Sequence, residues 1–301
     1  MIHPVTAAVI ALHRRLGDAR LQRLLGRYSI GEAHTALSDL LEGASTRESS
    51  ETQRLADKLA EMGCTIVTVL DAEYPGCLRA LADDAPPLLY VTGDLAATRE
   101  RSVAIIGTRR PCAAGRAAAR LVARAAAERQ WTVVSGNAPG IDATAHHECL
   151  TAGGTTIVYP PMCMAEYTPE FRARAPERTT VITPFAPGTT VAPWMFLRRN
   201  TLVAAQCRVA CAAETGSRGG TLDTVKKLLK MQREVYLTAL PESARFYRAH
   251  QMLAATPGVH LLPALDDDAM LLQELFNAGE RCPRESASVP VLDDLFAGEA
   301  W

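Results

Sequence analysis

The chain has 301 residues, of which 48% are hydrophobic and 22% charged, and its formal net charge is −1. This composition is ample for a packed core, in one large domain or in a main domain with small appendages, so we expect the chain to fold by itself. The near-neutral charge excludes a generally basic nucleic-acid binder, and any site for a polyanion must therefore be local.

Two further classes are disfavoured by the sequence. There is no run of about eighteen or more apolar residues, and no basic region precedes the apolar part of the N-terminus, so we expect no membrane span, no secretory signal and a cytoplasmic protein. The eight cysteines are scattered, without a CxxC pair and without histidines at zinc-like spacing. We expect reduced, mostly buried thiols, no metal and no other cofactor.

The N-terminal region indicates a small helical module. Three segments within residues 1–45 space their apolar positions three and four apart and stop near a glycine. A polar run at 44–52 separates them from a helix expected at 53–62.

The remainder of the chain is typical of an α/β protein. A strand is expected at 65–70, and residues 71–95, with a Tyr-Pro-Gly turn, a double proline and a short strand, are expected to form a rigid connection into the next domain. Thereafter apolar strands alternate with helices, which is typical of a parallel sheet covered on both faces. Strands are expected at 103–107, 132–136, 155–159, 179–183, 208–213, 234–239 and 259–262, and helices at 113–129, 142–152, 199–206, 221–232, 243–255 and 267–278.

Ligands of an open parallel sheet lie beyond the carboxyl ends of its strands, where helix N-termini offer unpaired amides. The first loop at such an end holds Gly107, Thr108, Arg109 and Arg110. Glycine allows close approach of a phosphate, threonine can donate a hydrogen bond, and arginine can bind phosphate in bidentate fashion. The dinucleotide fingerprint GxGxxG is absent, and a turn of this kind can also be a simple connection.

The second loop, "SGNAPGIDATAHHECL", contains Ser135, Gly136 and Gly140. Asp142 follows at a position where an N-cap would satisfy the first amides of a helix. We therefore favour the role of a helix cap for Asp142 over that of a functional acid. His146 lies one turn further along, and we expect it to bond to Asp142 in a structural role.

The third and fourth loops carry aromatic and basic residues. Phe196, Arg198, Arg199 and Asn200 lie at the start of a predicted helix, where bases could stack on the ring and guanidinium groups could bind phosphates. The alternative is a core aromatic beside solvated arginines. The fourth loop, "ETGSRGGT", could hold a phosphate for chemistry or bind the backbone of a polymer, and we expect its Glu214 to pair with an arginine; its candidate site residues are Arg218, Gly219, Gly220 and Thr221.

These loops, in this order, resemble the DprA/Smf family of DNA-processing proteins. The resemblance covers roughly residues 1–240 and rests on the strings "VAIIGTRRP", "VVSGNAPGIDATAHHECLTAGGTTIVY", "FLRRNTLVAA" and "GGTLDTVKKLLKMQREVY". It implies an extended Rossmann-like domain that binds and protects single-stranded DNA without reacting on it, and that helps to load a RecA-type recombinase during natural transformation or recombination. It also implies a homodimer and no catalytic residues.

The resemblance assigns DNA contact to Arg109, to the glycines of the second and fourth loops, and to the Arg199-Asn200 step with the preceding Phe196. It divides the chain into a helical, SAM-like module at 1–62, a Rossmann-like DNA-binding domain at 63–280 and a tail at 281–301. The sequence departs from the family in Asn137, where a leucine is usual, and the typical winged-helix module at the C-terminus is not recognisable.

The rival interpretation is an enzyme or a nucleotide sensor. The segment "GSRGGTLDT" also resembles the glycine-rich loop of the LOG phosphoribohydrolases, with Asp223 near the place of their catalytic glutamate. The proline and the spacing differ, and an acid in the first turn of a helix is favoured by the helix dipole in any case.

Overall fold

The computed structural model describes residues 9–10, 21, 46–163, 167, 175–262 and 268–282. Of the predicted N-terminal helices it describes only residues 9, 10 and 21, which are helical and buried. The rest of residues 1–45 and the tail from residue 283 onward lie outside the described residues. The domain boundaries therefore stay predictions.

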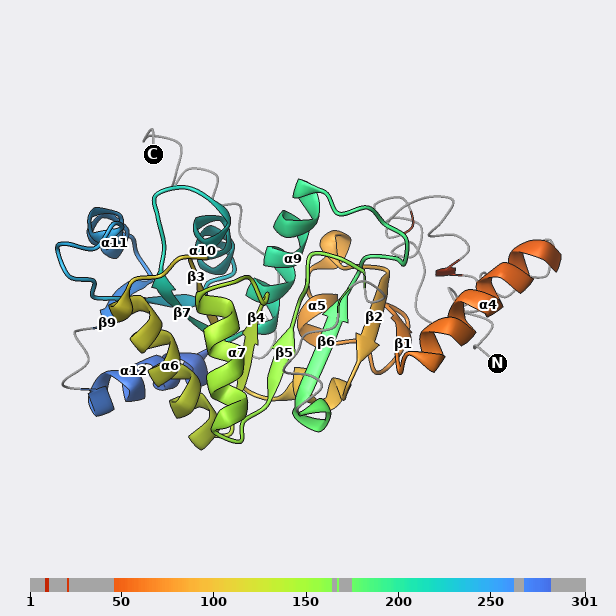
Figure 1. The fold of residues 1–301 in the computed structure, drawn as a ribbon, viewed down its shortest axis with the longest axis horizontal. Helices are drawn as coiled ribbons and strands as arrows, with labels where there is room; N and C mark the ends of the chain where they lie inside the picture. The colour runs from red at the N-terminus through yellow and green to blue at the C-terminus, as the bar shows by residue number, and fades with distance from the viewer. Residues whose placement is uncertain are drawn as a thin grey trace.

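A single sheet of nine strands forms the centre of the molecule (Figure 1). Its strands, in chain order, are β1 (Thr65–Thr68), β2 (Leu88–Thr92), β3 (Ser102–Gly107), β4 (Thr132–Ser135), β5 (Thr156–Val158), β6 (Thr179–Thr183), β7 (Val209–Glu214), β8 (Glu234–Thr238) and β9 (Val259–Leu262). Their order in space is β1-β2-β6-β5-β4-β3-β7-β8-β9. All neighbours from β6 to β9 run parallel, whereas β2 is antiparallel to both β1 and β6.

The predicted α/β class is confirmed, and each predicted strand is present. One expectation needs refinement, because residues 71–95 do more than connect two domains. Strand β2 lies inside the sheet, and all five of its residues are buried. A strand enclosed by neighbours on both sides and covered on both faces has no solvent-facing position, which explains its continuous apolar run.

Helices cover both faces of this sheet (Figure 1). The helices of the described residues are α4 (Thr46–Glu61), which projects from the β1 end of the sheet, α5 (Gly76–Arg79), α6 (Ala113–Glu128), α7 (Ile141–Thr151), α9 (Pro193–Gln206), α10 (Gly220–Lys230), α11 (Tyr247–Ala254) and α12 (Asp268–Arg281), with short 3-10 helices η1 (Ala82–Asp84), η2 (Leu95–Arg99) and η4 (Pro176–Arg178).

The alternation of side chains along β3 shows how the core divides. Val103 and Ile105 pack into one apolar cluster with α6, α7 and α12, whereas Ala104 and Ile106 pack into another with α9 and α10. Successive side chains of a strand point to opposite faces, so each buried strand contributes to both layers. This double packing fixes the level at which each strand ends, and hence the position of the loops that follow.

Candidate nucleic-acid interface

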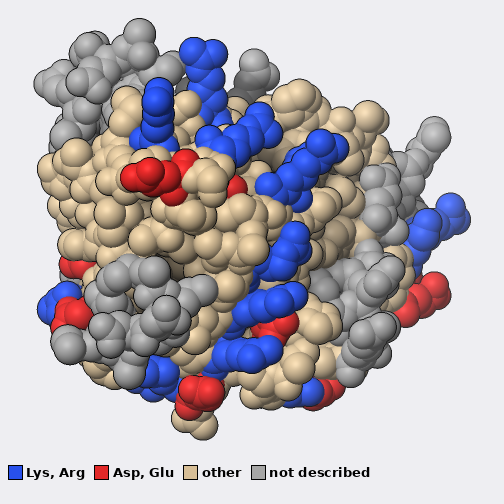
Figure 2. All heavy atoms as spheres, turned by 60° about the vertical axis from the view of Figure 1, so that its left-hand side comes forward, with Lys and Arg blue, Asp and Glu red and all other residues tan. Residues whose placement is uncertain are grey.

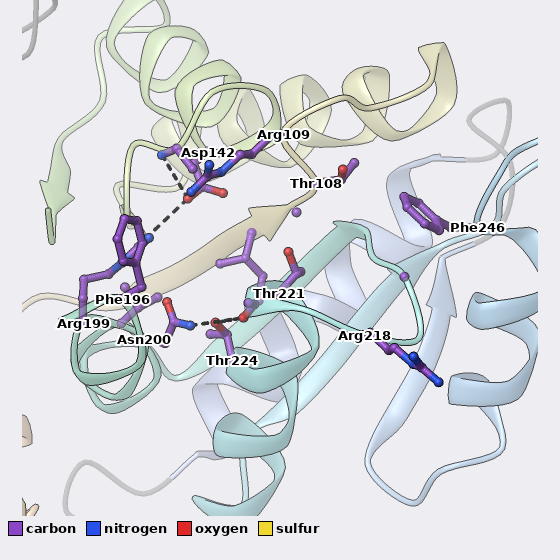
Figure 3. A pocket seen from close by; sticks show the side chains of 16 residues that line it. Thr108, Arg109, Asp142, Phe196, Arg199, Asn200, Arg218, Thr221, Thr224 and Phe246 are labelled. Carbon is purple, nitrogen blue, oxygen red and sulfur yellow. Dashed lines mark hydrogen bonds and ion pairs between the residues drawn. The ribbon is translucent and has the colours of Figure 1, made fainter. Parts of the chain in front are cut away.

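The direction in which successive strands are added to the sheet changes between the neighbouring parallel strands β3 and β7. From β3 the chain proceeds to β4 on one side of the sheet, while β7 and β8 are added on the other side. The loops after β3 and β7 therefore diverge and leave a crevice at the carboxyl edge, which is where open α/β sheets bind ligands. A pocket of about 370 Å³ lies there (Figure 3). It is lined by Ile106, Gly107, Thr108, Arg109, Ala138, Asp142, Phe196, Arg199, Asn200, Val203, Gly216, Arg218, Gly220, Thr221, Thr224 and Phe246.

The loop after β3 is held in place by close backbone packing. A Cβ on Gly107 would lie 2.4 Å from Cγ1 of Ile141, so only glycine fits there. The Thr108 amide donates to the carbonyl of Glu214 at 2.8 Å, which ties this loop to the end of β7. Arg109 is exposed, and its guanidinium carbon lies 5.8 Å from the centroid of the Phe196 ring.

The loop after β4 packs against the loop after β3. Gly140 has a φ of +93°, and a Cβ there would lie 2.5 Å from the Thr108 carbonyl oxygen. The Ser135 hydroxyl is buried and donates to the carbonyl of Ile105 at 2.7 Å. Ser135 and Gly140 therefore shape the wall of the pocket and are not among the residues that line it.

The prediction that Asp142 caps helix α7 is wrong. Gly140 is the N-cap residue, and Asp142 lies in the first turn, where it is buried. Its Oδ2 accepts a bond from the Ala138 amide and lies 3.6 Å from Nη1 of Arg199. Burial raises the pKa of Asp142, and the positive charge of Arg199 opposes that rise. The acid is thus the buried counter-ion of a pocket arginine.

Arg199 is unusual for an arginine because it is almost entirely buried. Burial lowers the pKa of its guanidinium, and the carboxylate of Asp142 counteracts that shift. Its Nε has no hydrogen-bond partner among the described residues. A Cβ on Gly136 would lie 1.0 Å from Nη1, so Gly136 serves the site by leaving room for this side chain.

Helix α9 begins at Pro193, six residues earlier than predicted, so Phe196 lies on the helix itself. Proline favours the first position of a helix, because its φ is already helical and its missing amide hydrogen is not needed there. Phe196, Arg199, Asn200 and Val203 follow helical spacing and share the face that lines the pocket. Arg198 falls on another face, where its Nη1 lies 3.9 Å from Oδ1 of Asp84.

The N-terminus of α10 closes the pocket on a third side. Its N-cap is Gly219, with a φ of +105°, and no side chain caps the first amides. Asn200 donates to the Gly220 carbonyl at 3.1 Å and to Oδ2 of Asp223 at 3.0 Å. Lys227 also donates to that carboxylate oxygen, at 2.7 Å. The α10 amides are therefore available to an anion, whereas Oδ2 of Asp223 already accepts two bonds.

The expected pairing of Glu214 with an arginine is also wrong. Its buried carboxylate accepts from the Cys112 amide at 2.7 Å, at the N-terminus of α6. His146 does not bond to Asp142 as predicted. Its Nδ1 lies 2.6 Å from Oγ1 of Thr156, and burial lowers its pKa to about 3. The structural role expected for His146 is consistent with this position.

The remaining candidates are spread around the pocket. Arg218 lines it at the end away from Phe196 (Figure 3), and Arg110 is exposed but not part of the lining. Phe246, which the sequence did not suggest, contributes an aromatic wall next to Gly216. It lies between β8 and β9, directly before α11, and no recognisable motif surrounds it, so only the packing of the structure identifies it.

Three expectations from the sequence concern disulfides, metal sites and membrane spans. The eight cysteines are unpaired, and within the described ranges no group of three or more potential metal ligands comes together. No helix among the described residues is long and apolar enough to cross a bilayer.

A family model described as DNA recombination-mediator protein A matches residues 65–260, so the chain belongs to that family. This match confirms the resemblance seen in the sequence. The putative DNA processing protein DprA of Mycobacterium tuberculosis is 28% identical over 97% of this chain and 77% of its own length. DNA processing protein DprA of Streptococcus pneumoniae is 31% identical over 58% of this chain and 62% of its own length.

Solved structures show the same fold. The X-ray structure of DNA processing protein A from Streptococcus pneumoniae matches with a TM-score of 0.59 and 22% identity, over 86% of this chain and 89% of that chain. The structure of DNA processing protein A from Helicobacter pylori matches with a TM-score of 0.60 and 20% identity, over 71% and 96% respectively.

Proposed function

We propose that the chain binds single-stranded DNA at the pocket between β3 and β7 and does not react on it. The observation that carries this proposal is the charge of the pocket. Three arginines, Arg109, Arg199 and Arg218, line it with a single acid, Asp142, although the whole chain has a net charge of −1. A local excess of positive charge is the expected footprint of a polyanion site in a protein that is not basic overall.

The details of the pocket suit a nucleotide chain. The Phe196 ring is half-buried beside Arg109, an arrangement in which a base can stack while the guanidinium binds a phosphate. The uncapped start of α10 offers further amide donors to phosphate oxygens. The Helicobacter pylori relative is described by its single-stranded DNA binding mode, which supports the same ligand for this chain.

The same contacts argue against the hydrolase alternative. Asp223, the acid nearest to a catalytic position, accepts bonds from Asn200 and Lys227. Glu214 is buried and holds the N-terminus of α6. A general base must reach its substrate through an available oxygen and a suitable pKa. Both carboxylates hold structural contacts, so we propose that the chain is not an enzyme.

Family membership also motivates proposals about the wider role. We propose that the protein protects single-stranded DNA in the cytoplasm, acts as a homodimer, and helps to load a RecA-type recombinase during DNA uptake or recombination. Sedimentation equilibrium would measure the dimer, and a strand-exchange assay with a RecA-type protein would measure loading. A monomer at all concentrations, or no stimulation of strand exchange, would contradict the respective proposal.

The central test is a fluorescence anisotropy titration of the purified protein with single-stranded and duplex oligonucleotides over a range of salt concentrations. We expect preference for the single strand, with a log–log salt slope that becomes more negative by about 0.7 for each phosphate contacted. An assay for base release from nucleoside monophosphates runs in parallel. Preference for duplex DNA, or release of a base, would contradict the proposal.

Arg109→Ala provides the first mutational test. We expect weaker binding of every sequence to a similar degree, because phosphate contacts carry no sequence information, and a salt slope smaller by about 0.7. The matched control is Arg54→Ala, at an exposed arginine on α4. Affinity equal to that of the wild type would remove Arg109 from the interface.

A further inference from the structure

Helix α6 carries a regular row of arginines that the pocket does not use. Arg116, Arg120 and Arg124 recur every fourth residue, so they lie along one face of the helix with Cβ atoms roughly 5–6 Å apart. We call these three residues the α6 arginine row. The helix starts just after the Arg109-Arg110 turn, so the row leads away from the mouth of the pocket.

The α6 arginine row is exposed. The side chains of Arg120 and Arg124 retain 51% and 59% of their accessible surface, and Arg116 is half-buried. In Figure 1, α6 lies on the left-hand side of the molecule, which comes forward in Figure 2. Lys and Arg side chains form a diagonal line across that face (Figure 2).

Like charges at this spacing oppose each other and destabilise a helix, so the row is unfavourable for α6 by itself. The only acid paired with it in the described part of the chain is Glu148 of α7. Oε2 of Glu148 accepts two bonds from Arg124, at 2.8 and 3.0 Å, and Oε1 lies 3.3 Å from Nε of Arg120. One carboxylate for three guanidinium groups leaves the row with an excess of positive charge.

Glu148 also orders the row. Its carboxylate is almost buried between α6 and α7, with 11% of its side chain exposed. It therefore fixes two flexible guanidinium groups while leaving most of their surface open. Ordering before binding reduces the side-chain entropy that a ligand would have to overcome.

We propose that the α6 arginine row continues the single-stranded DNA interface beyond the pocket, by binding phosphates of the strand that leaves it. This proposal rests on the function proposed above for the pocket. A regular line of exposed guanidinium groups, without an aromatic residue among them, suits the repeating phosphates of the backbone and not the bases. The row therefore adds length dependence to binding and no sequence preference.

The experiment compares the wild type with the triple variant R116Q/R120Q/R124Q. Anisotropy titrations use oligothymidylates of increasing length, from one that fills only the pocket to one several times longer. We expect unchanged affinity for the shortest strand and at least about tenfold weaker binding of the longest at low salt. The salt slope for the longest strand should shrink by roughly 2, since each single-strand phosphate contact contributes about 0.7.

A matched control removes the same three positive charges elsewhere. Arg54, Lys58 and Arg99 are exposed; the first two lie on α4, at the opposite end of the molecule from α6 (Figure 1), and Arg99 lies on η2. The variant R54Q/K58Q/R99Q should bind long and short strands like the wild type. An equal loss of long-strand affinity in this control would overturn the proposal, because the effect would then reflect net charge alone.

The outcomes also separate this proposal from the one on which it rests. If the wild type binds short strands and the triple variant R116Q/R120Q/R124Q binds long strands as tightly as the wild type does, the proposal for the pocket stands and the proposal for the row is overturned. A row that serves an acidic protein instead would give that same result. If the wild type binds no single-stranded DNA of any length, both proposals fail. Thermal unfolding of the variant should occur at a lower temperature, because the almost buried Glu148 loses both of its guanidinium partners, and unchanged binding of the shortest strand shows that the variant still folds.

Discussion

At the residue scale, the buried ion pair of Arg199 and Asp142 depends on a glycine, Gly136, whose lack of a side chain leaves room for it. Arg199 can lie beside Asp142 only because Gly136 has no Cβ, and each of these three residues is explained by the other two. Such a pair contributes little net stability, since both ions lose their hydration. Its value is positional, because it holds a guanidinium at the wall of the pocket at a defined place.

Gly136→Ala should therefore be strongly destabilising. The new Cβ would lie 1.0 Å from Nη1 of Arg199, which must move and leave Asp142 buried without its counter-ion. Displacing the guanidinium should cost up to about 3–5 kcal/mol in the free energy of unfolding, the cost of removing one partner of a buried pair. Urea unfolding measures the change. Gly76→Ala is the control, because no atom lies within 4 Å of its added Cβ. Equal stability of both variants would contradict this account.

At the scale of elements, the end of one strand supports the start of a distant helix. Glu214, the last residue of β7, accepts from the Cys112 amide at the N-terminus of α6. A carboxylate at this end of a helix is favoured by the helix dipole and satisfies an amide that lacks an intrahelical partner. The same contact aligns the Arg109 turn with the loop that carries Arg218, so it positions two walls of the pocket together.

Gly115→Ala tests this contact against helix propensity. Alanine in a helix is normally preferred to glycine by about 0.5–1 kcal/mol. Here its Cβ would lie 2.5 Å from Oε2 of Glu214, so we expect destabilisation by about 1–3 kcal/mol instead. Urea unfolding of Gly115→Ala in the wild-type and Glu214→Ala backgrounds forms a double-mutant cycle. The cost should be smaller when the carboxylate is absent, and an equal cost would place the strain elsewhere.

For the whole molecule, burial of neutral groups couples stability to pH. His146 joins α7 to β5 through Thr156, with burial holding its pKa at about 3. Burial also lowers the pKa of His250, which accepts from the Thr215 amide. Both side chains stay neutral in the folded protein at pH values where they are protonated in the unfolded chain, so acid favours unfolding.

His146→Gln should reduce the pH dependence of stability. The unfolded chain binds a proton at His146 below its ordinary pKa of 6.5, whereas the folded chain binds it only near 3, so stability falls as pH decreases between these values. The slope from this residue is at most about 1.4 kcal/mol per pH unit. Urea unfolding between about pH 6.5 and pH 5 should show a shallower slope in the variant. Identical slopes would show that His146 is protonated in the folded state.

Local sequence patterns were enough to predict the helices and strands and many of the residues that line the pocket. The Val- and Ile-rich runs are read directly as buried strands, and the Gly-Thr-Arg turn and the Gly-Gly-Thr loop fall at strand ends as predicted. Local sequence patterns could not predict contacts between segments that are distant in the chain. The bond from the Cys112 amide to Glu214 and the contribution of Phe246 depend on how elements pack, and no local spacing encodes either.

Sequence by itself determined the α/β class, the order of strands and helices, and the loops that could bind phosphate, because each follows from residues close together in the chain. Only the tertiary structure decided which arginines serve the pocket. Arg198 and Arg199 are neighbours, yet the helix turns one toward Asp84 and the other into the pocket beside Asp142. A helix rotates by about 100° per residue, so adjacent side chains point in different directions and packing selects the one that is used.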